Sequence, residues 1–448
     1  MKLIVIGGVA GGTSAAAKAK RVNPDLEITL FERLEQMSFA PCGLPYVIGG
    51  DITNFHKLIA RTPSDFAKSG IEALTQHEVL SVDYPNRVLE VRNLAEGRTF
   101  KASFDKLLIA TGASAVRPKI SGSDLENIFT LRSIRDGETI QKAILAAFNR
   151  SSNPKAVIVG GGYIGLEMAE AFQKRGLHVT VIEQLPRLLG NVDPDTAALT
   201  LKEVKRHGVA VLVSEHVNGF EGNGRVEKVL TSHGELEADL VLLAVGVRPN
   251  SGLAQSFGVE LTPFGSVEVN QQLETNLPGV YAAGDVTEVH HLVSGRHAYI
   301  PLGNTANHQG RVAGTNIAGG DSSFSGVVGT AISKVFDVAV GLTGLSELDA
   351  FQLGLEARAV SITTTDHAGY YPDRRPIMVR LVFETRTGRL LGSQIVGHGD
   401  AVKRIDVIAS LLHRAGTLED LANLDLGYAP PFSSVWDPLQ IAANTALR

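Results

Sequence analysis

The sequence predicts an α/β protein with two three-layer domains of one type, followed by a smaller α+β domain. Three observations predict this architecture. A strand, a glycine-rich turn, a helix and a second strand occur in that order at residues 2–32 and again at 155–183. An apolar strand that runs into a glycine and then a proline also occurs twice, at 105–118 and 239–249. Beyond residue 320 this pattern ends, and strands and helices of other spacing follow.

Size and composition exclude several classes of protein. The 448 residues suffice for three domains, and 44% apolar with 20% charged residues is ordinary for a globular protein. A net charge of −5 predicts no nucleic-acid partner. No apolar run approaches the roughly 18–20 residues of a membrane span, and the chain opens directly into a strand without a charged leader. The single cysteine excludes a disulfide framework, so we expect a cytoplasmic protein with no membrane partner.

The first repeated unit predicts a nucleotide-binding domain. Its strand, turn, helix and second strand are expected at residues 2–6, 7–12, 13–21 and 27–32. A glycine-rich turn between strand and helix lets backbone N–H groups face a pyrophosphate. Gly7 and Gly12 hold the outer positions of the G-x-G-x-x-G pattern, although Val9 occupies the middle one. Glu32 then supplies the acid that binds a ribose hydroxyl, which favours a Rossmann-like fold.

The second unit matches the same pattern completely. Its four parts are expected at residues 156–159, 160–165, 166–175 and 178–183. Gly160, Gly162 and Gly165 fill all three glycine positions, and Glu183 ends the second strand. An acid there accepts a hydrogen bond from a ribose 2′-hydroxyl and repels a 2′-phosphate. The sequence therefore predicts that NADH is preferred over NADPH.

The repeated strands DKLLIATG and DLVLLAVG, at 105–112 and 239–246, mark the places where the chain changes domain. We expect the second domain, 113–245, to be inserted into the first, which comprises 1–112 and 246–320. A further strand ends in Gly284 and Asp285, an acid that could bind a ribityl chain. The third domain, 321–448, is expected to hold strands at 380–383 and 390–396, a turn at 387–388 and helices at 400–415 and 434–446.

These motifs, at Gly7–Gly12, Ala110–Gly112, Gly160–Gly165 and Tyr281–Asp285, resemble those of the pyridine nucleotide–disulfide oxidoreductase family. The resemblance implies FAD on the first fold, NADH or NADPH on the second, and a homodimer formed by the C-terminal domain. The cofactor-binding residues expected on this basis are Gly7, Gly8, Val9, Ala10, Gly11, Gly12, Glu32, Arg33, Ala110, Thr111, Gly112, Gly160, Gly162, Tyr163, Ile164, Gly165, Glu167, Glu183, Gly246, Gly284, Asp285, Pro301, Leu302 and Thr305. No metal site is expected.

The segment Ser38–Tyr46 around Cys42 resembles the single-cysteine branch of this family. That branch includes coenzyme A-disulfide reductases, persulfide reductases, NADH oxidases and NADH peroxidases, in which the cysteine lies against the flavin and accepts its electrons. The alternative is a buried cysteine that acts only as a small apolar residue. An attacking cysteine must be a thiolate, so we expect the site to lower its pKa, through a helix beginning near Gly43 or through the flavin.

The substrate is expected to carry coenzyme A. Ala10 stands where the peroxidases carry a histidine, and the resemblance is closer to the coenzyme A-disulfide reductases. Pro41 and Phe432 depart from the residues frequent in those reductases, asparagine and tyrosine respectively. Coenzyme A phosphates need cations or hydroxyls, and candidates lie on one face of the first helix and elsewhere: Ser14, Lys18, Arg21, Ser38, Arg61 and His308.

Two tyrosines of the third domain complete the expected site. In the family, the corresponding tyrosines reach across the dimer to the partner's cysteine. Tyr428 matches one motif, and Tyr371 is chosen for the other, with Tyr370 as the close alternative. The sequence thus predicts reduction of coenzyme A disulfide, persulfide or polysulfide through Cys42. Reduction of oxygen by an NADH oxidase is the alternative, and electron transfer to a carrier protein is a third.

Overall fold

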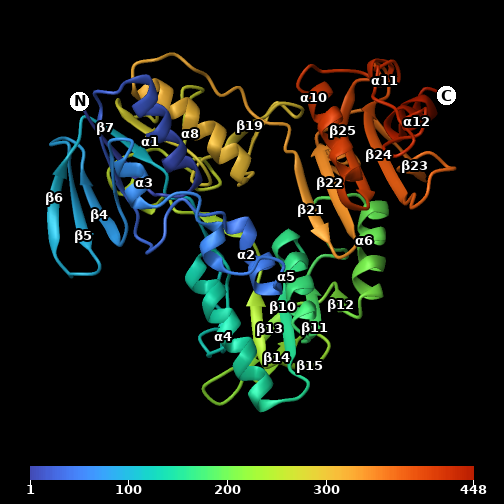
Figure 1. Cartoon of the computed structure of the whole chain (residues 1–448), viewed down its shortest axis with the longest axis horizontal. Coiled ribbons are helices and arrows are strands. Elements are labelled where there is room, and N and C mark those ends of the chain that lie inside the picture. Colours follow the sequence, from blue (N-terminus) through green and yellow to red (C-terminus); the bar gives the residue numbers. More distant parts are fainter.

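Three five-stranded sheets organise the chain in the computed structural model, which describes residues Met1–Arg448 (Figure 1). The N-terminal and C-terminal sheets lie at opposite sides of the upper half of the picture, and the middle part of the chain hangs below them. None of the helices has the length and apolar character that crossing a bilayer requires.

The first sheet is parallel throughout and has the strand order β18-β7-β1-β2-β3. Its strands are β1 (Lys2–Ile6), β2 (Glu27–Phe31), β3 (Ile71–Leu74), β7 (Lys106–Ile109) and β18 (Val280–Ala282). Two helices, α1 (Ala10–Val22) and α8 (Gly303–Ile317), pack tightly together on it, because a Cβ at Gly310 would lie only 2.3 Å from the carbonyl oxygen of Gly11. The antiparallel strands β4 (His77–Asp83), β5 (Val88–Asn93) and β6 (Thr99–Ser103) form a side sheet.

The second sheet repeats this plan with the parallel order β12-β11-β10-β16-β9. Its strands are β9 (Ile128–Phe129), β10 (Lys155–Val159), β11 (His178–Glu183), β12 (Ala210–Val213) and β16 (Leu240–Leu243). The helices of this part are α4 (Ile134–Arg150), α5 (Tyr163–Lys174) and α6 (Pro194–Arg206). It also has its own antiparallel side sheet, formed by β13 (Val217–Glu221), β14 (Lys228–Thr231) and β15 (Glu235–Glu237). Two three-layer folds of one type are therefore present, as the sequence predicts.

The two passages between these folds pair with one another. Strand β8 (Ala113–Ala115), on the way out, is antiparallel to β17 (Val247–Pro249), on the way back. The side chain of Asn250 reinforces the pair, because it accepts a hydrogen bond from Ser114 at 2.7 Å and donates one to the Thr111 carbonyl at 2.8 Å.

The third sheet is antiparallel, with the order β21-β22-β25-β24-β23. Its strands are β21 (Ala331–Val335), β22 (Val338–Gly344), β23 (Ala357–Thr365), β24 (Pro376–Glu384) and β25 (Leu390–Gly397), and its helices are α9 (Glu347–Gln352), η3 (Gly399–Arg404), α10 (Ile405–Leu412), α11 (Leu418–Ala422) and α12 (Pro438–Ala446). The expected hairpin is confirmed as β24 and β25. Strands β21, β22 and β23 were not predicted, because no turn signal in the sequence distinguishes them from loops.

Short elements make up the remaining structure: η1 (Pro41–Gly43), α2 (Leu44–Gly49), η2 (Phe55–Leu58), α3 (Pro63–Ala67), α7 (Gly252–Ser256), β19 (Val289–His291) and β20 (Arg296–Ala298). The helices after both glycine turns begin three residues earlier than expected, at Ala10 and Tyr163. The last glycine of each motif, Gly12 or Gly165, lies inside the first helical turn. Only a hydrogen atom fits there, because a side chain would clash with the carbonyl oxygen of the first glycine, Gly7 or Gly160.

Candidate active site

The first glycine turn, the end of β7 and the end of β18 meet at one edge of the first sheet. Gly7 has φ +107°, and a Cβ there would lie 2.1 Å from the Ala110 carbonyl oxygen. A Cβ at Gly12 would lie 1.9 Å from the Gly7 oxygen, and one at Gly11 would lie 3.1 Å from that of Ala283. The three segments thus touch backbone to backbone at the carboxyl ends of parallel strands, where such sheets bind nucleotides. This cradle fits FAD as the sequence predicts.

Glu32 and Glu183 hold their two loops in the same way. One carboxylate oxygen of Glu32 accepts from the N–H of Gly8 at 2.6 Å, and the other accepts from Leu34 at 2.8 Å. Glu183 accepts from Gly161 at 2.7 Å and from Leu185 at 2.8 Å. Burial raises the pKa of Glu32, against the lowering effect of these N–H donors. Both acids therefore stand beside the turns whose ligand they are expected to bind.

The other residues expected near FAD fall into four groups. Asp285 follows β18 and pairs with Arg132 at 3.2 Å, while the N–H of Gly284 donates to Gln309 at 2.8 Å. Thr111 and Gly112 follow β7 at the same edge, and Gly112 has φ +65°. Val9 and Ala10 lie in the turn and are half-buried, and Arg33 is exposed. Pro301 and Leu302 directly precede α8, and Thr305 is buried in its first turn.

A cavity of 530 Å³ lies at the carboxyl edge of the second sheet. This volume is ordinary for a small-molecule site. A Cβ at Gly162 would meet nothing within 4 Å, so the backbone there is open to a close ligand, as a pyrophosphate requires. Of the expected residues, Gly160, Gly162, Tyr163, Ile164, Glu183 and Gly246 line the cavity. Gly165 does not line it and packs on the Gly160 oxygen instead, with its Cβ position 2.0 Å away.

Glu215 and His216 also line this cavity, and the sequence analysis missed them. They follow β12, the strand beside β11, and so belong to the same edge as Glu183. The rule that ligands bind at the carboxyl ends of parallel strands would have found them, had the strand 210–213 been assigned. The Glu215 carboxylate is held by Ser232 at 2.9 Å and by the N–H of His233 at 3.0 Å.

Cys42 is exposed and lies in the short helix η1, directly before α2. The segment that carries it is tied to the first glycine turn, because the N–H of Ser38 donates to the Gly8 carbonyl at 2.7 Å. Ser38 has φ +49°, an unfavourable conformation for a residue with a side chain, and it sets the direction of the segment. The alternative of a buried, inert cysteine therefore does not apply.

The side chains around Cys42 do not lower its pKa. Partial burial of the thiol raises its pKa, and the carboxylates of Glu167 and Asp285 raise it further. A backbone hydrogen bond and Arg132 act in the opposite direction but are weaker. Helix α2 does begin at Leu44, close to the expected place. The expectation that this helix or the flavin makes the thiol acidic stays a prediction, because the burial and the carboxylates of the protein act in the opposite direction.

Glu167 stands where the three parts of the chain meet. It is half-buried on α5, and its Oε1 receives the hydroxyls of Tyr46 from α2 and Ser333 from β21, both at 3.4 Å. Burial raises the pKa of Glu167 to about 7, against the lowering effect of the two hydroxyls.

The expected phosphate-binding residues form two small groups. Ser14 on α1 donates to Asn307 of α8 at 2.5 Å, and His308, the next residue of α8, is exposed. Lys18 is half-buried and Arg21 exposed at the end of the same helix. Ser38 and Arg61 are also neighbours, since the Ser38 carbonyl accepts from the N–H of Ala60 at 2.8 Å. The Arg61 guanidinium is exposed and lies 5.7 Å from the ring centre of Phe66.

The tyrosine hydroxyls that meet are those of Tyr370 and Tyr428, at 3.0 Å on an exposed surface. Tyr371, chosen from the sequence, is instead half-buried and stacks on His367 with 6.1 Å between ring centres. The pairing therefore favours Tyr370, the alternative left open. Phe432 and Trp436 are exposed on the same domain, with 74% and 59% of their surface accessible.

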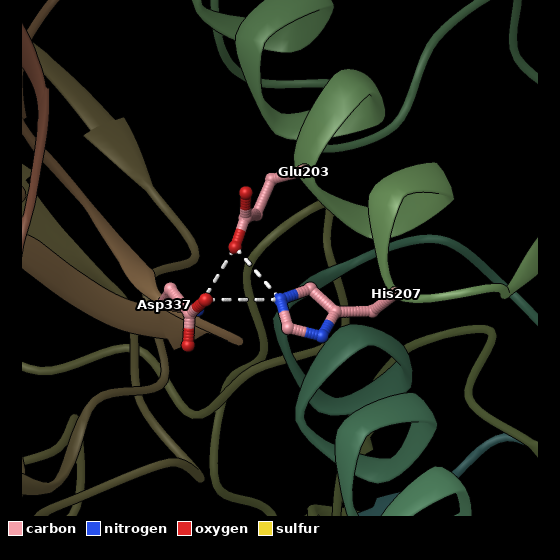
Figure 2. A group of neighbouring side chains, drawn as sticks. All are labelled: Glu203, His207 and Asp337. Atoms are coloured by element: carbon pink, nitrogen blue, oxygen red, sulfur yellow. Dashed lines mark hydrogen bonds and ion pairs between the residues drawn. The ribbon is translucent and has the colours of Figure 1, made fainter.

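A separate group of ionisable side chains joins α6 to the turn between β21 and β22 (Figure 2). His207 Nε2 lies 3.1 Å from Glu203 and 3.3 Å from Asp337. These three groups have the donor types of a metal site, but Arg206 already contacts all of them and supplies the positive charge. With His207 stacked on Phe336 at 4.4 Å, the group fastens two parts of the chain together.

Comparison with known proteins agrees with this arrangement. Residues 1–310 match the family described as pyridine nucleotide-disulphide oxidoreductase, and residues 330–439 match the dimerisation domain of that family. The chain is 40% identical over 445 residues to the NAD(P)H coenzyme A polysulfide/persulfide reductase of Pyrococcus horikoshii, with 99% of this chain and 98% of the relative covered. It is 32% identical over 448 residues to the coenzyme A disulfide reductase of Staphylococcus aureus, with 99% of each covered.

Solved structures give the same fold. The water-forming NADH oxidase of Lactobacillus brevis, bound to NADH, superimposes with a TM-score of 0.95 at 28% identity, covering 100% of this chain and 98% of that one. The chain therefore belongs to the pyridine nucleotide-disulphide oxidoreductase family and is an oxidoreductase with FAD and NAD(P)H as its cofactors.

Proposed function

We propose that this protein uses NAD(P)H to reduce coenzyme A disulfide, or a coenzyme A persulfide or polysulfide, through Cys42. The observation that carries the proposal is the position of this one exposed thiol, on a segment hydrogen-bonded to the first nucleotide turn and beside Glu167 of the second fold. The names of the relatives from Pyrococcus horikoshii and Staphylococcus aureus support a substrate that carries coenzyme A.

The chemistry follows from a thiol that has no second cysteine. The Cys42 thiolate attacks one sulfur of the substrate disulfide, the S–S bond breaks, and one coenzyme A thiolate leaves with the bonding electron pair. The product is a mixed disulfide between Cys42 and the other coenzyme A. Two electrons that originate in NAD(P)H cleave it, which releases the second coenzyme A and restores the Cys42 thiolate. FAD, held by the Gly7–Gly12 turn, Glu32 and Asp285, would supply the electron relay between the nucleotide and sulfur.

The phosphates of coenzyme A would contact the two exposed groups described above. One group is on α1, with Ser14, Lys18 and Arg21; Ser14 contacts Asn307 of α8, the helix that also carries His308. Ser38 and Arg61 form the other group, on the segment that leads to Cys42. A hydroxyl, a guanidinium and an ammonium are the donors that phosphate oxygens accept in proteins. Lys20 is not included, since its ammonium donates to the carbonyls of Pro24 and Leu26 at 2.7 Å.

We further propose a cytoplasmic homodimer whose third domain, 321–448, contributes tyrosines to the partner's site, with 113–245 as the NAD(P)H domain and 1–112 with 246–320 as the FAD domain. One cysteine in the whole chain fits a reducing compartment. The exposed rings of Phe432 and Trp436 would be covered by such a dimer.

Tyr370→Phe and Tyr428→Phe are each expected to lower kcat for coenzyme A disulfide by about 10²-fold, because a phenol supplies the proton that the departing thiolate needs. Their hydroxyls are 3.0 Å apart, so the loss in the double variant should be smaller than the product of the two single losses. Steady-state thiol release measures this. A larger loss in Tyr371→Phe than in Tyr370→Phe would return the role to Tyr371.

Glu183→Ala is expected to raise the ratio of kcat/KM for NADPH to that for NADH by about tenfold or more. The substitution removes a carboxylate that repels a 2′-phosphate and binds a 2′-hydroxyl. Glu221→Ala, which removes an exposed carboxylate that does not line the cavity, is the matched control and should leave the ratio unchanged. A wild-type enzyme that already prefers NADPH would contradict the assignment of Glu183.

The experiment that tests the proposed function is anaerobic NADH oxidation by the purified flavoprotein, with and without coenzyme A disulfide, followed by thiol release. Consumption only with the disulfide, and two thiols formed for each NADH, would support the proposal. No consumption until oxygen is admitted would favour an NADH oxidase, the activity that names the Lactobacillus brevis structure. Turnover only with an added electron-carrier protein would favour the third alternative, a reductase that transfers electrons to a carrier protein.

A further inference from the structure

The helix that follows Cys42 packs against the second fold, although it lies in the sequence of the first. The side chains of Leu44 and Ile48 on α2 are at most 1% exposed. They belong to one hydrophobic core that also contains Ile144 of α4 and Phe172 of α5. A helix of only six residues is not stable by itself, so this burial holds it in place. The position of α2 therefore depends on helices of the second fold.

Two glycines allow this close approach. A Cβ at Gly49, the last residue of α2, would lie 3.2 Å from the Cα of Ala171 on α5. A Cβ at Gly137 of α4 would lie 2.5 Å from the ring of Phe55, which follows α2 in η2. The backbones of α2 and α5 are thus in direct contact, with no free space that would let one approach the other further.

Side chains of the second fold also bind the carbonyl groups at the end of α2. The last carbonyl groups of a helix have no hydrogen-bond partner further along that helix. Arg175, the residue after α5, donates from Nε to the Ile48 carbonyl at 2.5 Å and from Nη2 to the Val47 carbonyl at 3.4 Å. Gln141 of α4 donates to the Val47 carbonyl at 3.1 Å. The guanidinium also places a positive charge at the negative end of the helix.

Arg175 differs in this respect from the lysine beside it. The ammonium of Lys174 pairs with the carboxylates of Asp51 and Glu170, both at 2.8 Å. Arg175 has no carboxylate partner, and its hydrogen bonds go to the α2 backbone. Its contribution is therefore directed at the helix that follows Cys42 rather than at a surface ion pair.

Cys42 lies at the other end of the same helical stretch. The helix η1 continues into α2, because the N–H of Leu44 donates to the Pro41 carbonyl. The two helices together span Pro41–Gly49, a rod of roughly 15 Å. On its other side the segment is tied to the first fold through the hydrogen bond from Ser38 to Gly8. The reactive thiol thus stands between an anchor on each nucleotide fold.

We propose that Arg175, supported by Gln141, is a positioning residue for Cys42, which anchors the cysteine segment to the second fold and so fixes where the thiol stands. The consequence for catalysis rests on the proposed function, in which Cys42 attacks a disulfide. Such an attack needs the reacting sulfur atoms in close alignment, so a small displacement of the segment slows it. Arg175 does not line the nucleotide cavity, and its loss should leave NADH binding unchanged.

The test compares Arg175→Met with the wild type in the rate at which iodoacetamide alkylates Cys42 at about pH 7. The methionine keeps most of the length of the side chain and removes the donors. When the end of α2 is released, the partly buried thiol becomes more accessible, and alkylation should be about threefold faster. Cys42 is the only cysteine, so the single adduct seen by mass spectrometry reports on it alone.

Turnover of coenzyme A disulfide should change in the opposite direction. We expect kcat of Arg175→Met to fall about tenfold, with KM for NADH unchanged. Arg175→Lys should restore most of both properties, because an ammonium can still donate to the Ile48 carbonyl. Arg150→Met removes an exposed arginine at the end of α4 and is the matched control, which should behave as the wild type.

Unchanged or slower alkylation in Arg175→Met, an unchanged kcat in an active enzyme, or no recovery in Arg175→Lys would overturn the proposal. Absorbance of bound FAD and thermal unfolding establish that the variants are folded. If Arg175→Met does not fold, Gln141→Leu replaces it and should give smaller changes in the same directions. Faster alkylation in an enzyme that never reduces coenzyme A disulfide overturns only the proposed function, and unchanged alkylation in one that does overturns only the anchoring.

Discussion

Cys42→Ser is expected to lower the rate of anaerobic coenzyme A disulfide reduction by at least about 10³-fold. A serine hydroxyl does not attack a disulfide at neutral pH, because it is hardly ionised and forms no S–S bond. No other cysteine in the chain can substitute for it. The measurement is thiol release under argon with NADH in excess. This is the largest effect that we expect from any single substitution.

The control for this variant is its reaction with oxygen. Serine is close in size to cysteine, and Cys42 is exposed, so the FAD content and the unfolding temperature should remain those of the wild type. Slow NADH oxidation in air should also persist, because it does not need the thiol. A variant that keeps a tenth of its disulfide reductase activity would show that Cys42 is not the residue that attacks the substrate.

The second large effect is expected from Gly160→Ala. Gly160 has φ +110°, and a Cβ there would lie 2.4 Å from the Ala244 carbonyl oxygen. Strain in φ and the clash together are expected to cost about 2–5 kcal/mol of the free energy of unfolding. Chemical denaturation of the flavoprotein measures this loss, which should come with weaker NADH binding.

Gly162→Ala is the matched control within the same turn. Nothing lies within 4 Å of its Cβ position, which opens toward the nucleotide cavity. The free energy of unfolding should therefore change by less than about 0.5 kcal/mol, while KM for NADH should rise about tenfold, since the methyl group would obstruct the pyrophosphate. Equal loss of stability in both variants would contradict the assignment of Gly162 as a ligand-contacting position.

Both nucleotide folds could be predicted from the sequence because their signals are local. Gly12 and Gly165 are required by contacts with the carbonyl oxygens of Gly7 and Gly160 in the same turn, and Glu32 and Glu183 follow or end the next strand in each unit. The repeated strands expected before residues 112 and 246 are also present, as β7 and β16. The third domain was predicted less completely. A glycine marks the turn between β24 and β25, whereas β21 and β22 are joined by Phe336 and Asp337, which carry no comparable turn signal.

The details of the site were less accessible to sequence reasoning. The pairing of Tyr370 rather than Tyr371 with Tyr428 depends on how the loop at 368–374 lies against residues 428–430. The choice of Lys334 between Glu167 and Glu170 depends on how β21 docks on α5. Neither contact has a spacing in the sequence that distinguishes it from its neighbour.

The sequence by itself determined the two nucleotide folds, their cofactors and the position of the reactive cysteine. It could do so because steric limits on the backbone of a glycine turn act within a few residues and leave a fixed pattern. Only the tertiary structure decided the direction in which the pKa values of the site shift. The pKa values of Cys42 and Glu167 are raised by burial and by carboxylates on α5 and after β18, which come together only when the parts of the chain pack. Burial and Coulomb interactions depend on distance in space, which the order of residues does not encode.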